Sequence, residues 1–267
     1  MGAPRRASDF FAGARLLGRG VRMYSGSLTL LLLGLIPAII SFAIVATGFV
    51  LLLFFADELA AQATWFADDW PGGERTLMRI AAGAAIIGAS VLIFVLTYTA
   101  LTLVIGDPFY EIISERVEEK VGGGSGTVDV PWYVSMRRNL ADSLRLVLFS
   151  VLVGIPLFLA GFIPIVGQTV VPVIDATVGG WLIALELTGI AFNRRGLRLA
   201  DRRKALRERR WLALGFGVPV FLLLLIPFAA IIVVPIAIAG STLLARTALG
   251  LSTEDRGAVN AAAAGAG

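Results

Sequence analysis

Three long stretches of the chain carry no charged side chain, and they constrain the fold more than any other feature. They run from Ser25 to Phe55, from Ile80 to Gly106 and from Trp211 to Ala245. A helix crosses the hydrocarbon core of a bilayer with about 20 apolar residues. A surface helix of a soluble domain would carry a polar face, and these stretches have none. The sequence therefore predicts an all-α integral membrane protein embedded in the lipid bilayer.

The composition agrees with this fold class and excludes several functions. Hydrophobic residues make up 57% of the chain and charged residues 16%, whereas soluble domains have about 45–50% and about 25%. The sequence contains no cysteine and no histidine, which excludes disulfides, thiolate chemistry and imidazole catalysis. No enzyme motif is present, so we expect no catalysis, no cofactor and no metal. The net charge of +4 comes from loops beside apolar stretches, which favours membrane orientation over nucleic-acid binding.

The chain is predicted to form a single membrane domain over residues 1–250, followed by a disordered tail at 251–267. The expected segments are an amphipathic interfacial helix at 8–24 with Ser8 as its N-cap, transmembrane spans at 28–55 and 80–105, a cytoplasmic helical segment with a glycine linker at 107–145, a hairpin at 146–192, a basic cytoplasmic loop at 193–210 and a second hairpin at 211–245.

Charge asymmetry predicts the orientation of these segments. The arm before the first span holds five arginines, and the loop at 193–210 holds nine lysines and arginines. The segment between the two spans is acidic. Because basic loops stay in the cytoplasm, both termini and the 193–210 loop are expected on the cytoplasmic side of the plasma (inner) membrane.

Both later apolar regions must then leave and return to the same side. Residues 211–245 form about 52 Å of helix, less than the roughly 60 Å of two full crossings, which predicts a re-entrant hairpin. Residues 146–192 are long enough for either a re-entrant hairpin or two spans. Each region contains Ile-Pro, five residues and Val-Val-Pro, at Ile163–Pro172 and Ile226–Pro235. Since proline breaks a helix, we expect both motifs at hairpin tips, and paired interrupted segments are typical of transport sites.

The stretch Phe162–Pro172 resembles the hairpin-tip signature of the CysZ family of bacterial sulfate permeases, within the wider etoposide-induced membrane protein superfamily. Further matching motifs are Pro108-Phe109, Arg202-Arg203-Lys204-Ala205-Leu206-Arg207, Leu214-Gly215-Phe216-Gly217 and Ala239-Gly240-Ser241-Thr242. The resemblance implies two long transmembrane helices, two hairpins that only partly penetrate the bilayer, assembly as a homo-oligomer and passage of sulfate. The family's arginine pair before the first span is missing, because that position reads Ser25-Gly26-Ser27-Leu28-Thr29. We therefore expect sulfate to bind weakly.

The candidate substrate-binding residues fall in two groups. Gly167, Gln168 and Thr169 at the first tip offer backbone, amide and hydroxyl groups that can replace water around an anion, or that only satisfy one another in a buried turn. Asp175 is either a proton carrier or a residue at a water-filled mouth.

The second group is cationic. Arg194 and Arg195 can attract anions to an inner vestibule, although a positive-inside loop explains them equally well. Arg22 is a more distant cation. With these residues, the family resemblance implies a membrane permease or channel for sulfate or a similar small inorganic anion (an oxyanion). The alternative is a non-transporting membrane scaffold of the wider superfamily.

Overall fold

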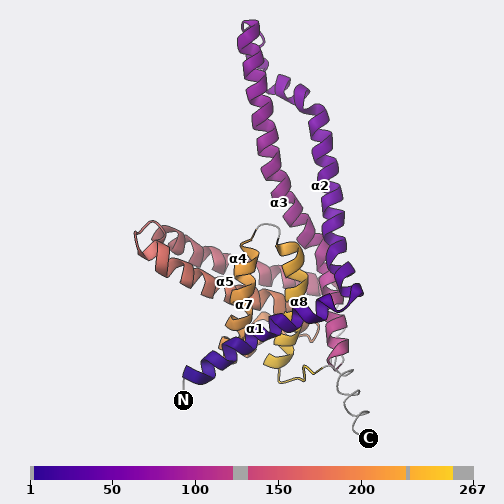
Figure 1. The fold of residues 1–267 in the computed structure, drawn as a ribbon, viewed down its shortest axis with the longest axis vertical. Coiled ribbons are helices and arrows are strands. Elements are labelled where there is room, and N and C mark those ends of the chain that lie inside the picture. Colours follow the sequence, from indigo (N-terminus) through magenta and orange to yellow (C-terminus); the bar gives the residue numbers. More distant parts are fainter. Residues whose placement is uncertain (1–2, 123–131, 227–228, 255–267) are drawn as a thin grey trace. The chain divides into compact units, whose positions relative to one another are not determined.

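A computed structural model describes residues 3–122, 132–226 and 229–254. Its elements, in chain order, are α1 (Ala3–Ser25), α2 (Leu28–Ala63), the short 3-10 helix η1 (Trp65–Ala67), α3 (Gly72–Lys120), α4 (Trp132–Ala160), α5 (Val166–Asn193), α6 (Leu199–Glu208), α7 (Arg210–Leu224) and α8 (Ala230–Ala248), as Figure 1 shows. Within the described residues, α2, α3, α4, α5 and α8 are long and apolar enough to cross a membrane, and α7 is shorter. The prediction of an all-α membrane fold is confirmed.

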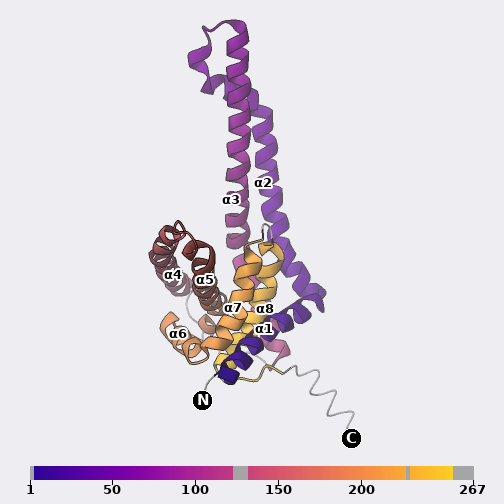
Figure 2. The same ribbon diagram turned by 60° about the vertical axis from the view of Figure 1, so that its left-hand side comes forward.

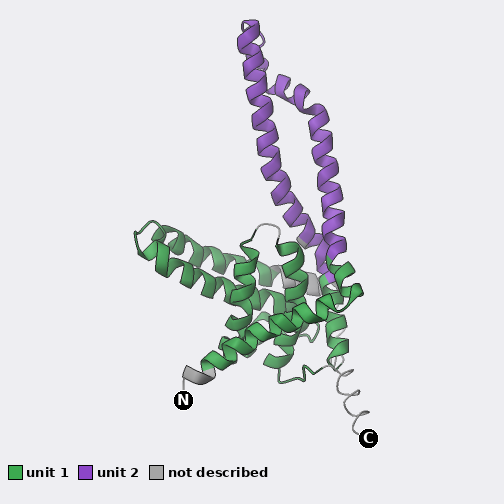
Figure 3. Cartoon of the chain, in the orientation of Figure 1, with its two compact units in different colours: residues 1–34, 110–267 green, residues 35–109 purple. Residues whose placement is uncertain are grey.

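Contacts divide the chain into two compact units, drawn in different colours in Figure 3. One unit comprises residues 35–109, which are most of α2, η1 and the larger part of α3. The other comprises residues 1–34 and 110–267.

The unit of residues 35–109 is a helical hairpin with a sparse interior. Phe49 and Phe94 meet edge to face with their ring centroids 5.1 Å apart, and Arg79 pairs with Asp68 at 2.9 Å near the turn. Most apolar side chains of this unit are exposed. Exposed leucine, isoleucine and phenylalanine over this length are stable in hydrocarbon or against another protein surface, not in water.

The other unit is built around α1, α5, α7 and α8. Figures 1 and 2 show α1 lying across α7 and α8, with Leu16, Leu17 and Tyr24 buried in the common core. The expected amphipathic helix is therefore present, but its apolar face packs on protein. Its predicted start at Ser8 is wrong, because the helix begins at Ala3 and Ser8 lies inside it.

Glycines set the spacing of the helices in this core. A Cβ atom added at Gly215 of α7 would lie 1.9 Å from the carbonyl oxygen of Phe10 in α1. One added at Gly217 would lie 1.9 Å from the carbonyl oxygen of Gly180 in α5. The α1–α7 and α5–α7 crossings thus bring backbones into direct contact, as small residues permit in membrane helix bundles.

The proline-based expectations are correct in part. The turn between α4 and α5 contains Ile163 and Pro164, which is where the first hairpin tip is expected. However, Pro172 and Pro235 lie inside α5 and α8, so the prediction that these two prolines break the helix at the hairpin tips is wrong. Pro108 likewise lies inside α3. Proline removes one backbone N–H, and a membrane helix tolerates this where neighbouring groups satisfy the freed carbonyl.

The segment at 193–210 differs from the expectation, and the glycine linker and the C-terminal tail lie almost entirely outside the described residues. The basic segment at 193–210 was expected as a loop, but it contains α6, whose first turn is capped by the Asp201 carboxylate accepting from the Arg198 N–H. Apart from Gly122, the expected glycine linker falls outside the described residues, as does the tail beyond Glu254.

Candidate functional site

Two arginines at the end of α5 face two glutamates near the end of α3. Arg195 Nη1 donates to Glu118 Oε1 at 2.6 Å and to the carbonyl oxygen of Ala191 at 2.7 Å. Arg194 Nη2 donates to Glu115 Oε1 at 3.3 Å. Because Glu115 and Glu118 are three residues apart, they lie on the same face of α3. Both guanidinium groups therefore reach one turn of that helix.

The two ion pairs differ in burial. The side chains of Arg195 and Glu118 are 9% and 2% exposed, whereas Glu115 is 54% exposed. The Arg195–Glu118 pair is therefore desolvated, and each charge depends on the other for compensation. The Arg194–Glu115 pair is open to solvent on its acidic side, where ion pairs contribute little to stability.

The arginines retain hydrogen-bonding capacity that the protein does not use. Arg194 Nη1, Arg195 Nε and Arg195 Nη2 are buried and have no hydrogen-bond partner within the described residues. Unmade bonds from buried charged donors are costly. A guanidinium presents its N–H groups in a planar fork that suits carboxylate, phosphate and similar oxyanions. These three nitrogen atoms are therefore candidate donors to an oxyanion.

Contacts from α8 hold the end of α3 and the body of α5 in place. Thr242 Oγ1 and Ser114 Oγ are 2.9 Å apart, and both residues are buried. Arg246 Nη2 donates to the carbonyl oxygen of Val121 at 3.1 Å. Ser241 Oγ donates to the carbonyl oxygen of Leu187 at 3.0 Å. These bonds fix the acidic turn of α3 opposite the arginines.

Another buried arginine, Arg202, was missed by the sequence analysis. Arg202 of α6 is 4% exposed, and its guanidinium lies against α5 where Gly189 has no side chain, since a Cβ there would be 2.0 Å from Arg202 Nη1. Burial lowers the pKa of Arg202, while the charges of Glu186 and Asp142 raise it. The sequence could have indicated its burial, because Arg202 lies on the same face of α6 as the apolar, buried Leu199 and Leu206.

The residues predicted at the first hairpin tip lie far from the arginines. Gly167, Gln168 and Thr169 occupy the first turn of α5, about 40 Å along the helix from Arg194. Gln168 and Thr169 are exposed, and Thr169 Oγ1 donates to the carbonyl oxygen of Ile165 at 2.6 Å. Gly167 is needed sterically, because a Cβ there would lie 2.1 Å from the carbonyl oxygen of Gly161.

The other two predicted residues join neither group. Asp175 is exposed in α5, between the tip and the arginines. Arg22 is exposed near the end of α1 and makes no ion pair in the part of the chain described. The structure thus brings together only Arg194 and Arg195 from the predicted set.

Comparison with known proteins decides the family. A family model described as sulfate transporter CysZ/etoposide-induced protein 2.4 matches residues 16–235. The chain belongs to this family. Together with the apolar helices, this membership makes it a multi-pass membrane protein.

Individual relatives named sulfate transporter CysZ are similar to parts or most of the chain. The protein of Pseudomonas fluorescens Pf-5 is 32% identical over 150 residues, covering 55% of this chain and 60% of the relative. That of Vibrio parahaemolyticus is 34% identical over 153 residues, covering 54% of this chain and 60% of the relative. That of Pectobacterium atrosepticum is 25% identical over 238 residues, covering 87% of this chain and 81% of the relative. The matched part of the chain thus spans about 60% of the length of the first two relatives.

Proposed function

We propose that this chain is a permease or channel that passes sulfate or a similar small oxyanion across the plasma (inner) membrane, with Arg194 and Arg195 as its anion contact. The observation that carries the proposal is the set of three buried guanidinium nitrogen atoms of Arg194 and Arg195 without a partner in the described chain. Membership in the sulfate transporter family supports an oxyanion as the ligand. Two arginines on α5 would supply the charge that the stretch before the first span lacks.

Flux into liposomes tests the proposal directly. Purified protein reconstituted into vesicles is expected to pass sulfate, with sulfite, phosphate and chloride compared in parallel. Arg194 and Arg195 already bind two carboxylates, so we expect weak sulfate affinity, in the high-micromolar to millimolar range. Calorimetric titration measures it. Absence of flux for all four anions would favour the non-transporting scaffold.

The hairpin tip is proposed as a second part of the path, with Asp175 further along α5. Gln168 is exposed and at the first turn, so Gln168→Ala is expected to lower flux severalfold without changing thermal stability. Gly167→Val is expected to lower flux and thermal stability, because the valine side chain would displace the Gly161 carbonyl. Unchanged flux in Gln168→Ala would restrict the tip to a structural turn.

The proposed orientation places the N-terminus and α6 in the cytoplasm. The chain has no cysteine, so single cysteines give an unambiguous readout. Ala7→Cys and Ala200→Cys are expected to resist an impermeant thiol reagent in intact cells, while Gly73→Cys, between η1 and the apolar part of α3, is expected to label. All three positions are exposed. Labelling of Ala200→Cys would contradict the proposed topology.

Self-association is also part of the proposal. The apolar side chains exposed on α2 and α3 provide a surface that either lipid or a second copy of the chain can cover. Light scattering of the detergent-solubilised protein is expected to give a mass of two or more copies. A monomeric mass in mild detergent would contradict it.

A further inference from the structure

Helix α6 is amphipathic, and its outer face is basic. Leu199, Arg202 and Leu206 are buried. Besides Asp201, whose carboxylate accepts from the Arg198 N–H, the exposed residues of α6 are Ala200, Arg203, Lys204, Arg207 and Glu208. The same five residues line a hollow of about 360 Å³. Three cations and one carboxylate give this hollow a net charge of +2.

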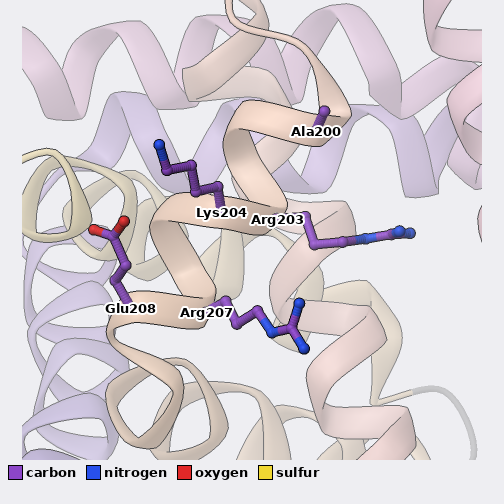
Figure 4. A pocket seen from close by; sticks show the side chains of 5 residues that line it. All are labelled: Ala200, Arg203, Lys204, Arg207 and Glu208. Carbon is purple, nitrogen blue, oxygen red and sulfur yellow. The ribbon is translucent and has the colours of Figure 1, made fainter.

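The charges of the hollow are available to a ligand. Figure 4 shows Lys204 and Glu208 pointing to one side of the helix, and Arg203 and Arg207 to the other. None of these four side chains joins an ion pair in the part of the chain that the structure describes. Unpaired lysine and arginine at one surface attract phosphate, with arginine able to bind it through two N–H groups.

The position of α6 in the chain identifies the source of the phosphate. The helix connects α5, a candidate transmembrane helix, to the apolar α7. Trp211 in the first turn of α7 lies under two guanidinium groups, those of Arg6 at 5.8 Å and Arg210 at 5.9 Å from the ring centroid. Tryptophan flanked by arginine is typical of the level of the lipid headgroups. These features favour a position of the basic face at the level of the headgroups.

We propose that the outer face of α6 binds the phosphate headgroups of anionic phospholipids in the adjacent leaflet, with Arg203 and Arg207 as contacts on one side of the helix and Lys204 as a contact on the other. The inference is independent of anion passage, because these residues belong neither to the arginine pair of α5 nor to the hairpin tip. It assigns the basic face of α6 to lipid recognition, whereas its buried Arg202 packs inside the protein.

Native mass spectrometry of the detergent-purified protein tests this site. Phosphatidylglycerol is titrated against phosphatidylcholine, with soluble glycerol phosphate as the headgroup alone. Each basic residue near an anionic lipid contributes about fivefold in affinity, so three contribute about 100-fold. The variant R203Q/K204Q/R207Q is expected to lose about that factor for phosphatidylglycerol only. The matched variant R75Q/R116Q/K120Q removes the same charge elsewhere and is expected to bind normally.

The remaining variants and ligands separate the alternatives. R203K/R207K keeps the charge and is expected to retain phosphatidylglycerol binding within about threefold; an equally large loss would overturn the assignment to charge. Equal losses in the two glutamine variants would overturn the assignment to α6. Glycerol phosphate as tight as phosphatidylglycerol would replace the lipid by a soluble phosphate compound and also overturn the proposal.

Discussion

Replacing Arg195 by methionine is expected to abolish anion flux and to lower the free energy of unfolding by about 3–5 kcal/mol. The Glu118 side chain is 2% exposed, and without Arg195 its carboxylate would remain buried without a counter-charge, for which losses of this size are typical. Arg116→Met is the matched control, because Arg116 and Glu119 form an exposed pair at 3.7 Å, for which we expect a loss of about 0–1 kcal/mol.

A double variant separates transport from stability. Arg195→Met combined with Glu118→Met replaces the pair by apolar side chains, which is often neutral or stabilising in a buried site. We therefore expect stability to return while flux stays lost. Thermal unfolding in detergent and sulfate flux in liposomes measure the two effects. Wild-type flux in the double variant would show that the pair is only structural, and full stability of Arg195→Met would contradict the burial argument.

The second large effect is expected at the crossing of α5 and α7. In Gly217→Ala the new Cβ would lie 1.9 Å from the carbonyl oxygen of Gly180 and 3.2 Å from Ala184 Cβ. Backbone atoms cannot yield as a flexible side chain can, so the helices must separate and lose their packing. Overpacking of this kind costs about 1–3 kcal/mol and sometimes more. We expect a value at the upper end, seen as a lower melting temperature and a lower yield of monodisperse protein.

Gly154→Ala of α4 is the control for this prediction. Among the residues that the structure describes, no atom beyond its own helix lies within 4 Å of the Cβ position at Gly154. Alanine has the higher helix propensity, by about 1 kcal/mol, so this variant is expected to be as stable as the wild type or more stable. Equal melting temperatures of Gly217→Ala and Gly154→Ala would contradict the backbone contact between α5 and α7.

The membrane helices and the first hairpin tip could be predicted because they depend on local sequence. An uncharged run of about 20 residues is stable in lipid only as a helix, whatever its neighbours are. The extension of α3 through Pro108 to Lys120 could not be predicted in this way. Propensity treats an internal proline as a break, whereas a membrane helix can continue where its surroundings satisfy the freed carbonyl.

The sequence by itself determined the all-helical membrane architecture, the turn at Ile163–Pro164 and the basic character of residues 193–210. Only the tertiary structure decided what the charges in that segment do. Arg194 and Arg195 meet glutamates 79 and 77 residues away, and Arg202 is buried against Gly189. The reason is physical: the net charge of a segment is a sum over residues, but the partner and the burial of each charge depend on how helices distant in sequence cross. Those crossings are set by backbone contacts at glycines such as Gly180 and Gly217, whose register no local pattern records.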